Sequence, residues 1–457
     1  MSRRRRASGA SRATEFGPSR SGVAAIGWRG TALLAAAVAP LYGAHLLFGA
    51  NQPMAAQALT ALCGAILLVG LAVPRLRRAL PQIKGLWWIA GLFALTLSIA
   101  IVSLGAGPPG AAHPIWAWAD LPPTITVNRS ATLLAISQLL GLAALFVFGA
   151  LIAGQRIWGV RLATVFLAGG AIWAGIAILV FLSGAQIGVS GRLAGGFLSA
   201  NSAATMLGVL VVMATGWLFK ALRESAEIGG PDRWSRLALA VAPLMLLVFA
   251  LILTGSRMGS LATLAGVLTL VVWQAFAEPT RSWRTLGVAA AICLMAAVAV
   301  GQGNDLVLRR VAALDQDVEV RSVIFAVHWR AFIDAPVWGS GLGSFTDVNV
   351  YLTSAETYGP LWSIRATHNV YLQWLQEAGL LGSLPMFALI GGVIAAAALR
   401  ARTLARGGWA LRAMIAANVV ILVHGLTDYA LQVPSISAAW ALLLGAQFGF
   451  AQIRGRG

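Results

Sequence analysis

Short polar segments lie between the long apolar stretches of this chain, and five of them carry side chains suited to chemistry. The first segment, residues 192–201, begins with Arg192 and enters an apolar run at Asn201. We expect Asn201 to cap the N-terminus of that helix, because its side chain can accept a backbone hydrogen bond there. A helix N-terminus beside an arginine favours a phosphate group. The alternative is a capped helix whose arginine binds only a lipid headgroup.

The second segment, residues 254–260, joins two apolar runs with almost no loop between them. Its Arg257 is therefore expected at membrane depth or at the outer edge of the membrane, where an unpaired charge is costly. A protein carboxylate or a bound phosphate would offset that cost. The small residues around Arg257 permit close helix packing. A structural arginine that reaches the membrane surface is the alternative.

The third segment, residues 319–334, has the pattern of a helix lying at the membrane interface and ending before Pro336. Four of its side chains share one helical face: Arg321, Phe325, His328 and Phe332. The glycine-rich loop 339–345 that follows is superficially similar to a dinucleotide-binding loop. No strand is predicted before this loop and no helix after it, so the sequence argues against nucleotide binding. An interfacial helix without chemistry is the alternative.

The fourth segment contains His368 and Asn369, followed after nine residues by Gly379 and Gly382. On a continuous helix this spacing aligns the imidazole with both glycines, where another helix or a lipid chain could approach closely. Histidine titrates near neutral pH and is a common general base. A structural histidine on such a face is the alternative.

The fifth segment contains His424 and Asp428, which are four residues apart and could pair on one face of a helix. A polar anchor at a helix end is the alternative for this pair. With the orientation derived below, all five histidines fall on the outer side of the membrane or in the outer part of a span. ATP and sugar nucleotides are cytoplasmic, so a reaction on the outer side needs a donor that is already activated and carried by a lipid.

The elements that must position these segments are membrane helices. Of the 457 residues, 59% are hydrophobic and 11% are charged, which excludes both a soluble globule and a disordered chain. Lipid offers the backbone no hydrogen bonds, so each long apolar run must be a helix. The sequence predicts an all-α polytopic membrane protein of about twelve spans. The runs are residues 30–49, 54–73, 85–104, 130–153, 160–182, 201–219, 237–254, 258–276, 285–302, 379–399, 411–428 and 435–452.

The net charge of +18 is a signal of orientation. Most lysines and arginines fall in the two termini and in alternate loops, which predicts a cytoplasmic N-terminus and C-terminus. No nucleic-acid partner is needed to explain the charge. The two cysteines lie in apolar runs and offer neither a disulfide framework nor a zinc site. The expected parts are a disordered basic tail (1–22), nine spans (23–302), a periplasmic loop with interfacial helices (303–378), and three spans with a short basic tail (379–457).

Taken in order, the five segments resemble the O-antigen ligase and polymerase family (Wzy_C type) over roughly residues 190–435. The corresponding patterns are Arg-Leu, Phe and Asn at 192–201, Thr-Gly-Ser-Arg at 254–257, an arginine-bearing helix with a glycine-rich loop at 321–345, and His-Asn with Gly-x-x-Gly at 368–382. The resemblance implies a GT-C-like membrane glycosyltransferase that needs no metal or other cofactor. Such an enzyme moves a glycan from undecaprenyl diphosphate to an acceptor hydroxyl on the periplasmic side.

The resemblance also suggests roles for individual residues. Arginine forks match the oxygens of a diphosphate leaving group, and a histidine can take the proton of the attacking hydroxyl. The candidate catalytic residues are His368, Arg257 and Arg321. The candidate diphosphate-binding residues are Arg192, Arg257, Arg321 and Asn201. Residues that could support them are His328, Asn369, His424 and Asp428.

The acceptor distinguishes the activities within this family. A ligase would use lipid A–core, and a polymerase of O-antigen or exopolysaccharide would use a second lipid-linked glycan. A protein O-oligosaccharyltransferase is an alternative with the same leaving group. Outside catalysis, the alternatives are a lipid-glycan flippase or transporter, a haem-handling protein, and a catalytically silent family member. A transporter is disfavoured because the ionisable groups gather on the outer side and no internal repeat is found.

Overall fold

The computed structural model describes residues 28–118, 121–187, 189, 191–226, 230–277, 304–402 and 408–453, with the backbone alone described for 304–318. Within these ranges the chain forms helices and no strand, which confirms the predicted all-α class. The long helices are α1 (Trp28–Leu46), α2 (Pro53–Ala72), α4 (Leu86–Val102), α5 (Arg129–Ala153), α6 (Arg156–Leu182), α7 (Ala200–Ser225), α8 (Pro231–Leu253), α9 (Arg257–Ala277), α11 (Asn304–Asp334), α14 (Val370–Ala401), α15 (Gly408–His424) and α16 (Pro434–Ala451). The short ones are α3 (Pro74–Ala79), α12 (Phe345–Leu352) and α13 (Tyr358–Leu361), with 3₁₀ turns at Phe48–Ala50, Leu80–Gln82, Pro114–Trp118 and Ala430–Gln432.

Apolar helices of membrane-spanning length make up the body of the protein. Among the described residues, eight helices are long and apolar enough to cross a membrane: α2, α5, α6, α7, α8, α9, α14 and α16. The segment 74–82 and α4 meet the same criteria together across a bend of 86°, which brings the number to up to nine. Helices α1 and α15 are apolar but shorter. These lengths are those of a multi-pass helical membrane protein.

Every predicted apolar run that the structure describes overlaps a helix. The predicted run 285–302 and the predicted tail 1–22 lie outside the described residues. The total of twelve spans and the cytoplasmic position of both termini therefore stay predictions.

Helix α7 is the most buried of the candidate spans, with 94% of its membrane-length window inside the protein. It packs against α8, α9 and α15. Helices in lipid associate through close packing and polar contacts, because the lipid is as apolar as the helices. The contact of α5 with α16 follows this rule. A Cβ atom on Gly149 would lie 2.4 Å from the carbonyl oxygen of Leu442, so the two backbones approach too closely for any larger residue.

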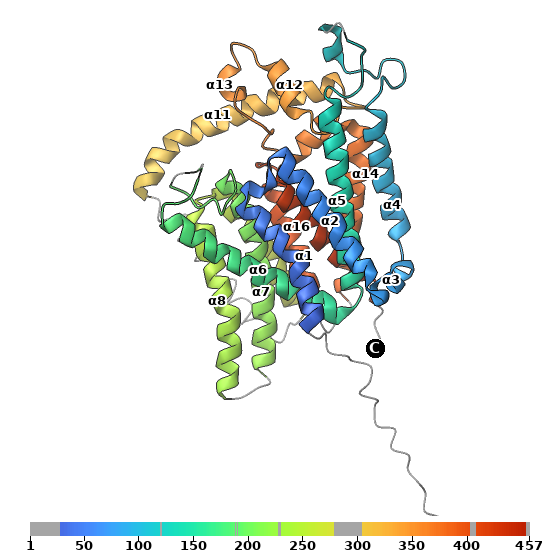
Figure 1. Ribbon diagram of the computed structural model, residues 1–457. Helices are drawn as coiled ribbons and strands as arrows, with labels where there is room; N and C mark the ends of the chain where they lie inside the picture. Colours follow the sequence, from blue (N-terminus) through green and yellow to red (C-terminus); the bar gives the residue numbers. More distant parts are fainter. Residues whose placement is uncertain are drawn as a thin grey trace, which may run out of the picture.

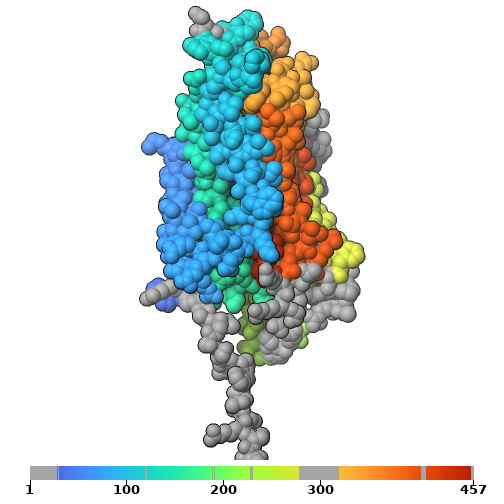
Figure 2. Space-filling model, turned by 90° about the vertical axis from the view of Figure 1, so that its right-hand side faces the viewer, coloured from blue at the N-terminus to red at the C-terminus, as the bar shows by residue number. Residues whose placement is uncertain are grey.

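Helices α11, α12 and α13 lie across one end of the bundle, and we refer to them as the cap (Figure 1). Figure 2 shows α14 beside the helices of the first half of the chain, with the cap at the top. Helix α11 ends at Asp334, before Pro336, as predicted, but it begins at Asn304 and is longer than the predicted segment 319–334. Helix α12 follows the glycine-rich loop, where no helix was predicted. The local sequence of α12 carries no helical signal. The helix therefore depends on tertiary packing, in which Phe345 and Val348 are buried.

Helix α14 is interrupted at Gly379, whose φ of 57° and ψ of −170° are not helical. The loop after α11 bonds to the backbone groups that this break releases. The amides of Leu380 and Leu381 donate to the carbonyls of Pro336 and Val337 at 2.9 and 3.2 Å, and those of Ser340 and Gly341 donate to the carbonyls of Gln376 and Glu377 at 2.9 and 2.8 Å. We refer to residues 336–343 and 376–381 together as the glycine seam.

Two glycines face each other in the glycine seam. A Cβ on Gly339 would lie 2.4 Å from the amide nitrogen of Gly379, and a Cβ on Gly379 would lie 2.3 Å from the carbonyl oxygen of Val337. The buried carboxylate of Glu377 completes the contact by accepting from the amide of Gly343 at 2.8 Å. In the described structure the glycine-rich loop therefore serves to repair a broken helix and to join α11 to α14.

The predicted alignment of His368 with Gly379 and Gly382 is wrong. His368 lies before the first residue of α14, and Asn369 caps that helix by accepting from the amides of Tyr371 and Leu372. Gly379 then interrupts the helix. The helical spacing assumed for these residues does not exist, because the cap and the break both divide the segment.

Substituting Gly379 by alanine should destabilise the protein severely. The new methyl group would overlap the Val337 carbonyl, and alanine is strained at this positive φ. We expect a loss of roughly 3 kcal/mol or more, measured as a lower Tm in detergent by fluorescence-detected size exclusion. Gly391→Ala in the same helix is the matched control, because no atom lies within 4 Å of its Cβ position. Equal Tm values for the two variants would contradict the account of the seam.

Candidate functional site

Arg321 lies at the centre of a polar cluster at the cap end of the bundle. Its guanidinium acts electrostatically on three groups that are distant in sequence, His368, His424 and Asp428. These groups come from the residue before Asn369, the end of α15 and the turn after α15. The Arg321 side chain itself is half-buried on α11. Four predicted site residues from three separate segments are thus brought together.

His368 occupies a constrained position in this cluster. Its φ is 56°, a left-handed conformation that non-glycine residues rarely adopt, and its ring packs edge-on against Tyr429 with centroids 4.9 Å apart. The Nδ1 atom is buried and makes no hydrogen bond with another described residue. Burial, and secondly the charge of Arg321, lower the pKa of His368 to about 4. The imidazole is therefore neutral at pH 7, although its pKa is lower than the near-neutral value expected from its residue type.

His424 and Asp428 do not form the predicted pair on one helical face. Helix α15 ends at His424, and Asp428 lies in the turn beyond it, so the spacing of four residues does not bring their side chains together. Instead, His424 Nδ1 lies 2.7 Å from the hydroxyl oxygen Oγ1 of Thr205 on α7. His424 consequently ties the end of α15 to α7.

Asp428 is completely buried beside two polar side chains, those of Asn201 and Arg321. Burial raises the pKa of Asp428 to about 7, and the backbone amides of Tyr429 and Ala430 oppose that shift together with Asn201 and Arg321. Neither carboxylate oxygen has a hydrogen bond of good geometry to the described residues. The carboxyl group can therefore hold or release a proton near neutral pH.

Asn201 is not the N-cap of α7, which corrects the prediction for that residue. Ser199 takes this position, with extended backbone angles and a side chain that accepts from the amide of Asn201. The side chain of Asn201 accepts instead from Arg192 Nη2 at 3.0 Å, while Arg192 Nε donates to the carbonyl of Thr254 at 2.7 Å. Arg192 therefore clamps the turn before α9 to the start of α7. Its role at a diphosphate stays a prediction.

Arg257 and Arg321 differ from Arg192 in having no such clamp. Both are half-buried, and neither makes a hydrogen bond or ion pair with another residue in the described ranges. Arg257 is the first residue of α9, three positions after the Thr254 that Arg192 holds. A half-buried guanidinium retains strong donor capacity for an anion, because its charge is only partly solvated.

His328 lies apart from the cluster and has a structural role. It is completely buried, with Nδ1 2.8 Å from the Gln376 side chain and Nε2 3.2 Å from Asn349 Oδ1. Burial lowers the pKa of His328, so the ring is neutral. The side chain links α11 to α12 and α14, about two turns along α11 from Arg321.

Sequence reasoning did not single out Tyr429, Thr205 or Ser199. Tyr429 packs against His368, Thr205 binds His424, and Ser199 caps α7 and is hydrogen-bonded to Tyr429. Tyr429 follows Asp428 directly, so an aromatic residue beside a predicted site was the signal available. Thr205 gave none, because a threonine within an apolar helix usually bonds to its own backbone.

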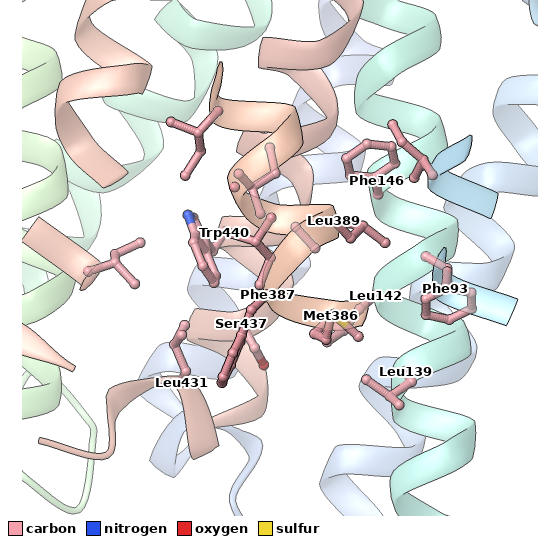
Figure 3. Close-up of a pocket in the computed structure, with 18 of the residues that line it drawn as sticks. Phe93, Leu139, Leu142, Phe146, Met386, Phe387, Leu389, Leu431, Ser437 and Trp440 are labelled. Carbon is pink, nitrogen blue, oxygen red and sulfur yellow. The ribbon is translucent and has the colours of Figure 1, made fainter. Parts of the chain in front are cut away.

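An apolar cavity of about 620 Å³ lies between α4, α5, α14, α15 and α16. Figure 3 shows side chains that line it, among them Phe93 of α4, Phe146 of α5, Phe387 of α14 and Trp440 of α16. Val370, Tyr371 and Gly425 line the cavity as well, and the amide of Val370 donates to the carbonyl of Gly425 at 2.9 Å. Val370 follows His368 by two residues and Gly425 follows His424 directly, so part of the cavity wall is close in the chain to two residues of the polar cluster.

The donor chemistry of the cluster is that of an anion site. No group of three or more His, Cys, Asp and Glu side chains able to hold a metal ion occurs among the described residues. Arg321, a neutral histidine and a carboxyl group with a pKa of about 7 instead interact with one another, close in the chain to residues that line an apolar cavity. Such an arrangement can bind a phosphate group attached to a lipid and can exchange a proton beside it.

The fold and this site define a multi-pass helical membrane protein with a cationic centre at one end of its bundle. Residues 242–387 match the model of the O-antigen ligase family (Wzy_C). The matched segment contains Arg257, Arg321, His368 and the whole glycine seam, and it confirms the family predicted from the sequence. A comparison with curated proteins found no match. Together, the helical membrane fold and the family match support a membrane enzyme that transfers glycans.

The buried Asp428 should make the stability of the protein depend on pH. An acid with a pKa near 3.8 when unfolded and about 7 when folded keeps its proton longer in the folded state, so stability falls as pH rises between these values. Asp428→Asn removes this titration at nearly constant size. We expect the variant to gain on the order of 2–4 kcal/mol relative to the natural protein between pH 4 and pH 8, measured by thermal unfolding in detergent. A difference that is constant over this range would contradict the shifted pKa.

Proposed function

We propose that this protein transfers a glycan from undecaprenyl diphosphate to an acceptor hydroxyl on the periplasmic side of the inner membrane. It acts as an O-antigen ligase or as a polysaccharide polymerase, without a metal ion. The observation that carries the proposal is the convergence of Arg321, His368 and Asp428 beside the apolar cavity. The family match supports the same chemistry.

The diphosphate is held by Arg257 and Arg321, which are half-buried and have no clamp like that of Arg192 among the described residues. In the transfer, the bond between the sugar C1 and the diphosphate oxygen breaks, and the electron pair leaves with lipid diphosphate. Two guanidinium groups stabilise the negative charge that develops on this oxygen. Arg192 acts on the same group indirectly, by holding the turn that begins α9.

His368 accepts the proton of the acceptor hydroxyl as its oxygen bonds to C1. A pKa of about 4 makes the imidazole a weak base in the empty site. The charge of Arg321 adds to the effect of burial in lowering this pKa. An anionic diphosphate bound beside Arg321 offsets that charge, so His368 becomes a stronger base when the donor is present. The proton is then moved only in the complex that can react.

The apolar cavity receives the first part of the lipid chain. It lies between α4, α5, α14, α15 and α16, and its lining residues Val370 and Gly425 are close in the chain to His368 and His424. A lipid chain that leaves a diphosphate bound at the polar cluster could therefore enter it. A protein O-oligosaccharyltransferase would use the same donor site and differ in its acceptor. A non-catalytic glycan transporter would need no general base at the donor phosphate.

The first test is transfer in liposomes. Undecaprenyl-diphosphate glycan is supplied with lipid A–core or with a second lipid-linked glycan, in the presence of EDTA. We expect one acceptor to be glycosylated, and the productive acceptor separates a ligase from a polymerase. His368→Asn should lower the rate about 10²-fold or more, because it removes the base. Asparagine is chosen because it tolerates a positive φ, which alanine does not.

His113→Asn is the matched control for the histidine, since His113 is also buried near the cap end but belongs to the loop before α5. It should transfer at close to the normal rate. Full transfer by a correctly inserted His368→Asn protein would refute the general-base role. Loss of transfer in EDTA that added metal restores would refute metal independence.

The arginines can be tested separately from the base. Arg257→Gln and Arg321→Gln should each lower kcat about 10²–10³-fold, because each removes charge from the leaving group. Arg321→Lys should recover part of the rate, since it restores charge without the fork. Arg330→Gln on the same helix is the control, because that side chain is exposed. If Arg330→Gln and Arg321→Gln lose the same activity, the role assigned to Arg321 is wrong.

A further inference from the structure

Two exposed aromatic side chains lie at α13, the shortest helix of the cap: Tyr358 is its first residue and Trp362 follows its last. Tyr358 and Trp362 are 57% and 63% exposed, and their rings are nearly parallel at 11°, with centroids 6.0 Å apart. A four-residue helix is too short to be stable by itself. Two exposed aromatic rings at such a helix therefore need an explanation. We propose that this pair, the α13 platform, stacks against a sugar ring of a glycan substrate.

A chain of buried hydrogen bonds holds α13 from below. Leu361 is completely buried, and its carbonyl accepts from Asn349 Nδ2 at 2.8 Å. Asn349 Oδ1 then contacts His328 Nε2 at 3.2 Å, and His328 Nδ1 contacts the amide group of Gln376 at 2.8 Å. The chain runs from α14 through α11 and α12 to α13.

The hydrogen positions in this chain follow from its end at Leu361. Because Asn349 donates to that carbonyl through Nδ2, its Oδ1 must accept, so Nε2 of His328 carries the hydrogen. Nδ1 of a neutral His328 then accepts, but it faces Gln376 Oε1 at 2.8 Å, and Gln376 Nε2 makes no hydrogen bond with another described residue. Turning the Gln376 amide over places Nε2 against Nδ1 as the donor, and every member of the network then has a partner of the right kind. A buried network satisfied in this way is rigid.

The chain entering α13 is fixed as well. Ser354 donates to Glu356 Oε2 at 2.6 Å, and the amide of Ser354 donates to Thr357 Oγ1 at 2.9 Å. The platform is therefore held at both ends before any ligand arrives, which lowers the entropy lost on binding. The same loop provides hydroxyl and carboxylate groups beside the two rings.

A glycan fits these surroundings better than a lipid does. Figure 1 shows α12 and α13 on the side of α11 that faces away from the spanning helices. A sugar ring offers a face of C–H groups to an aromatic ring, whose face is electron-rich, and hydroxyl groups to a polar rim. Trp362 is six residues before His368, so the platform lies at most about 22 Å along the chain from that residue. A short oligosaccharide can bridge this distance.

The inference rests on the proposed function, and it can be tested apart from catalysis. Two lipid-free probes are titrated into the detergent-solubilised protein by calorimetry: the repeating-unit oligosaccharide of the donor and the core oligosaccharide of the acceptor. We expect Tyr358→Leu and Trp362→Leu to raise the Kd for one probe about threefold to tenfold each, and Trp362→Phe to preserve much of the affinity. The probe affected identifies whether the platform serves the donor or the acceptor.

Trp329→Leu is the control, because Trp329 is 50% exposed on α11 but does not belong to the platform. In the liposome assay the platform variants should raise the KM of the same substrate and leave kcat unchanged. Unchanged Kd values in both leucine variants, equal losses in Trp329→Leu, or no binding of either probe by the natural protein would overturn the inference. A further outcome would also overturn the inference: Trp362→Leu keeps its stability in nanodiscs while Trp362→Gln loses it. That result would indicate that Trp362 is buried in lipid. Transfer by the natural protein tests the proposed function independently of these outcomes.

Discussion

The backbone hydrogen bonds across the glycine seam are the constraint on which the rest of this structure depends. A helix broken inside an apolar bundle exposes amides and carbonyls that lipid cannot satisfy. In this protein the loop after α11 satisfies them, and it can approach closely enough because Gly339 and Gly379 lack side chains. The repair fixes α11 against α14. It thereby fixes the distance between Arg321, on α11, and His368, at the start of α14.

Electrostatics in the polar cluster follow from that placement. Arg321 is held among groups that burial keeps close to neutral, with the pKa of His368 lowered and that of Asp428 raised. The site without substrate therefore carries an excess of positive charge in a poorly solvated setting. A doubly charged lipid phosphate is the kind of ligand that relieves this excess. In the proposed function, charge balance and proton transfer are coupled, because an anion bound to Arg321 would also make His368 more basic.

Much of the fold could be read from the sequence, because lipid allows an apolar run only one regular structure. The positions of α5, α6 and α16 follow directly from that rule. The break at Gly379 could not be read, since a single glycine is also tolerated in an unbroken helix. Asn201 was assigned to a cap that Ser199 occupies, because both residue types cap helices and spacing does not choose between them.

The candidate site was predictable in its members and not in its geometry. Family resemblance drew attention to Arg321 and His368, and helical spacing to Asp428, but their proximity depends on contacts between segments more than 40 residues apart in the chain. Helical spacing suggested a direct pair between His424 and Asp428, and the end of α15 separates them. Local periodicity describes neighbours on one helix, and this site is made where several helices end.

The attachment of the cap has a consequence for how such proteins diversify. The cap is joined to the bundle at the glycine seam and through the hydrogen-bonded chain from Gln376 to Leu361. Helix α13 packs mainly against α11 and makes few contacts with the spanning helices. Replacements at the exposed positions of 353–365, which exclude the buried Leu361, would therefore leave the spanning helices and Arg321 in place. Under the proposed function, such changes would alter which glycans are recognised without altering the residues assigned to the lipid diphosphate.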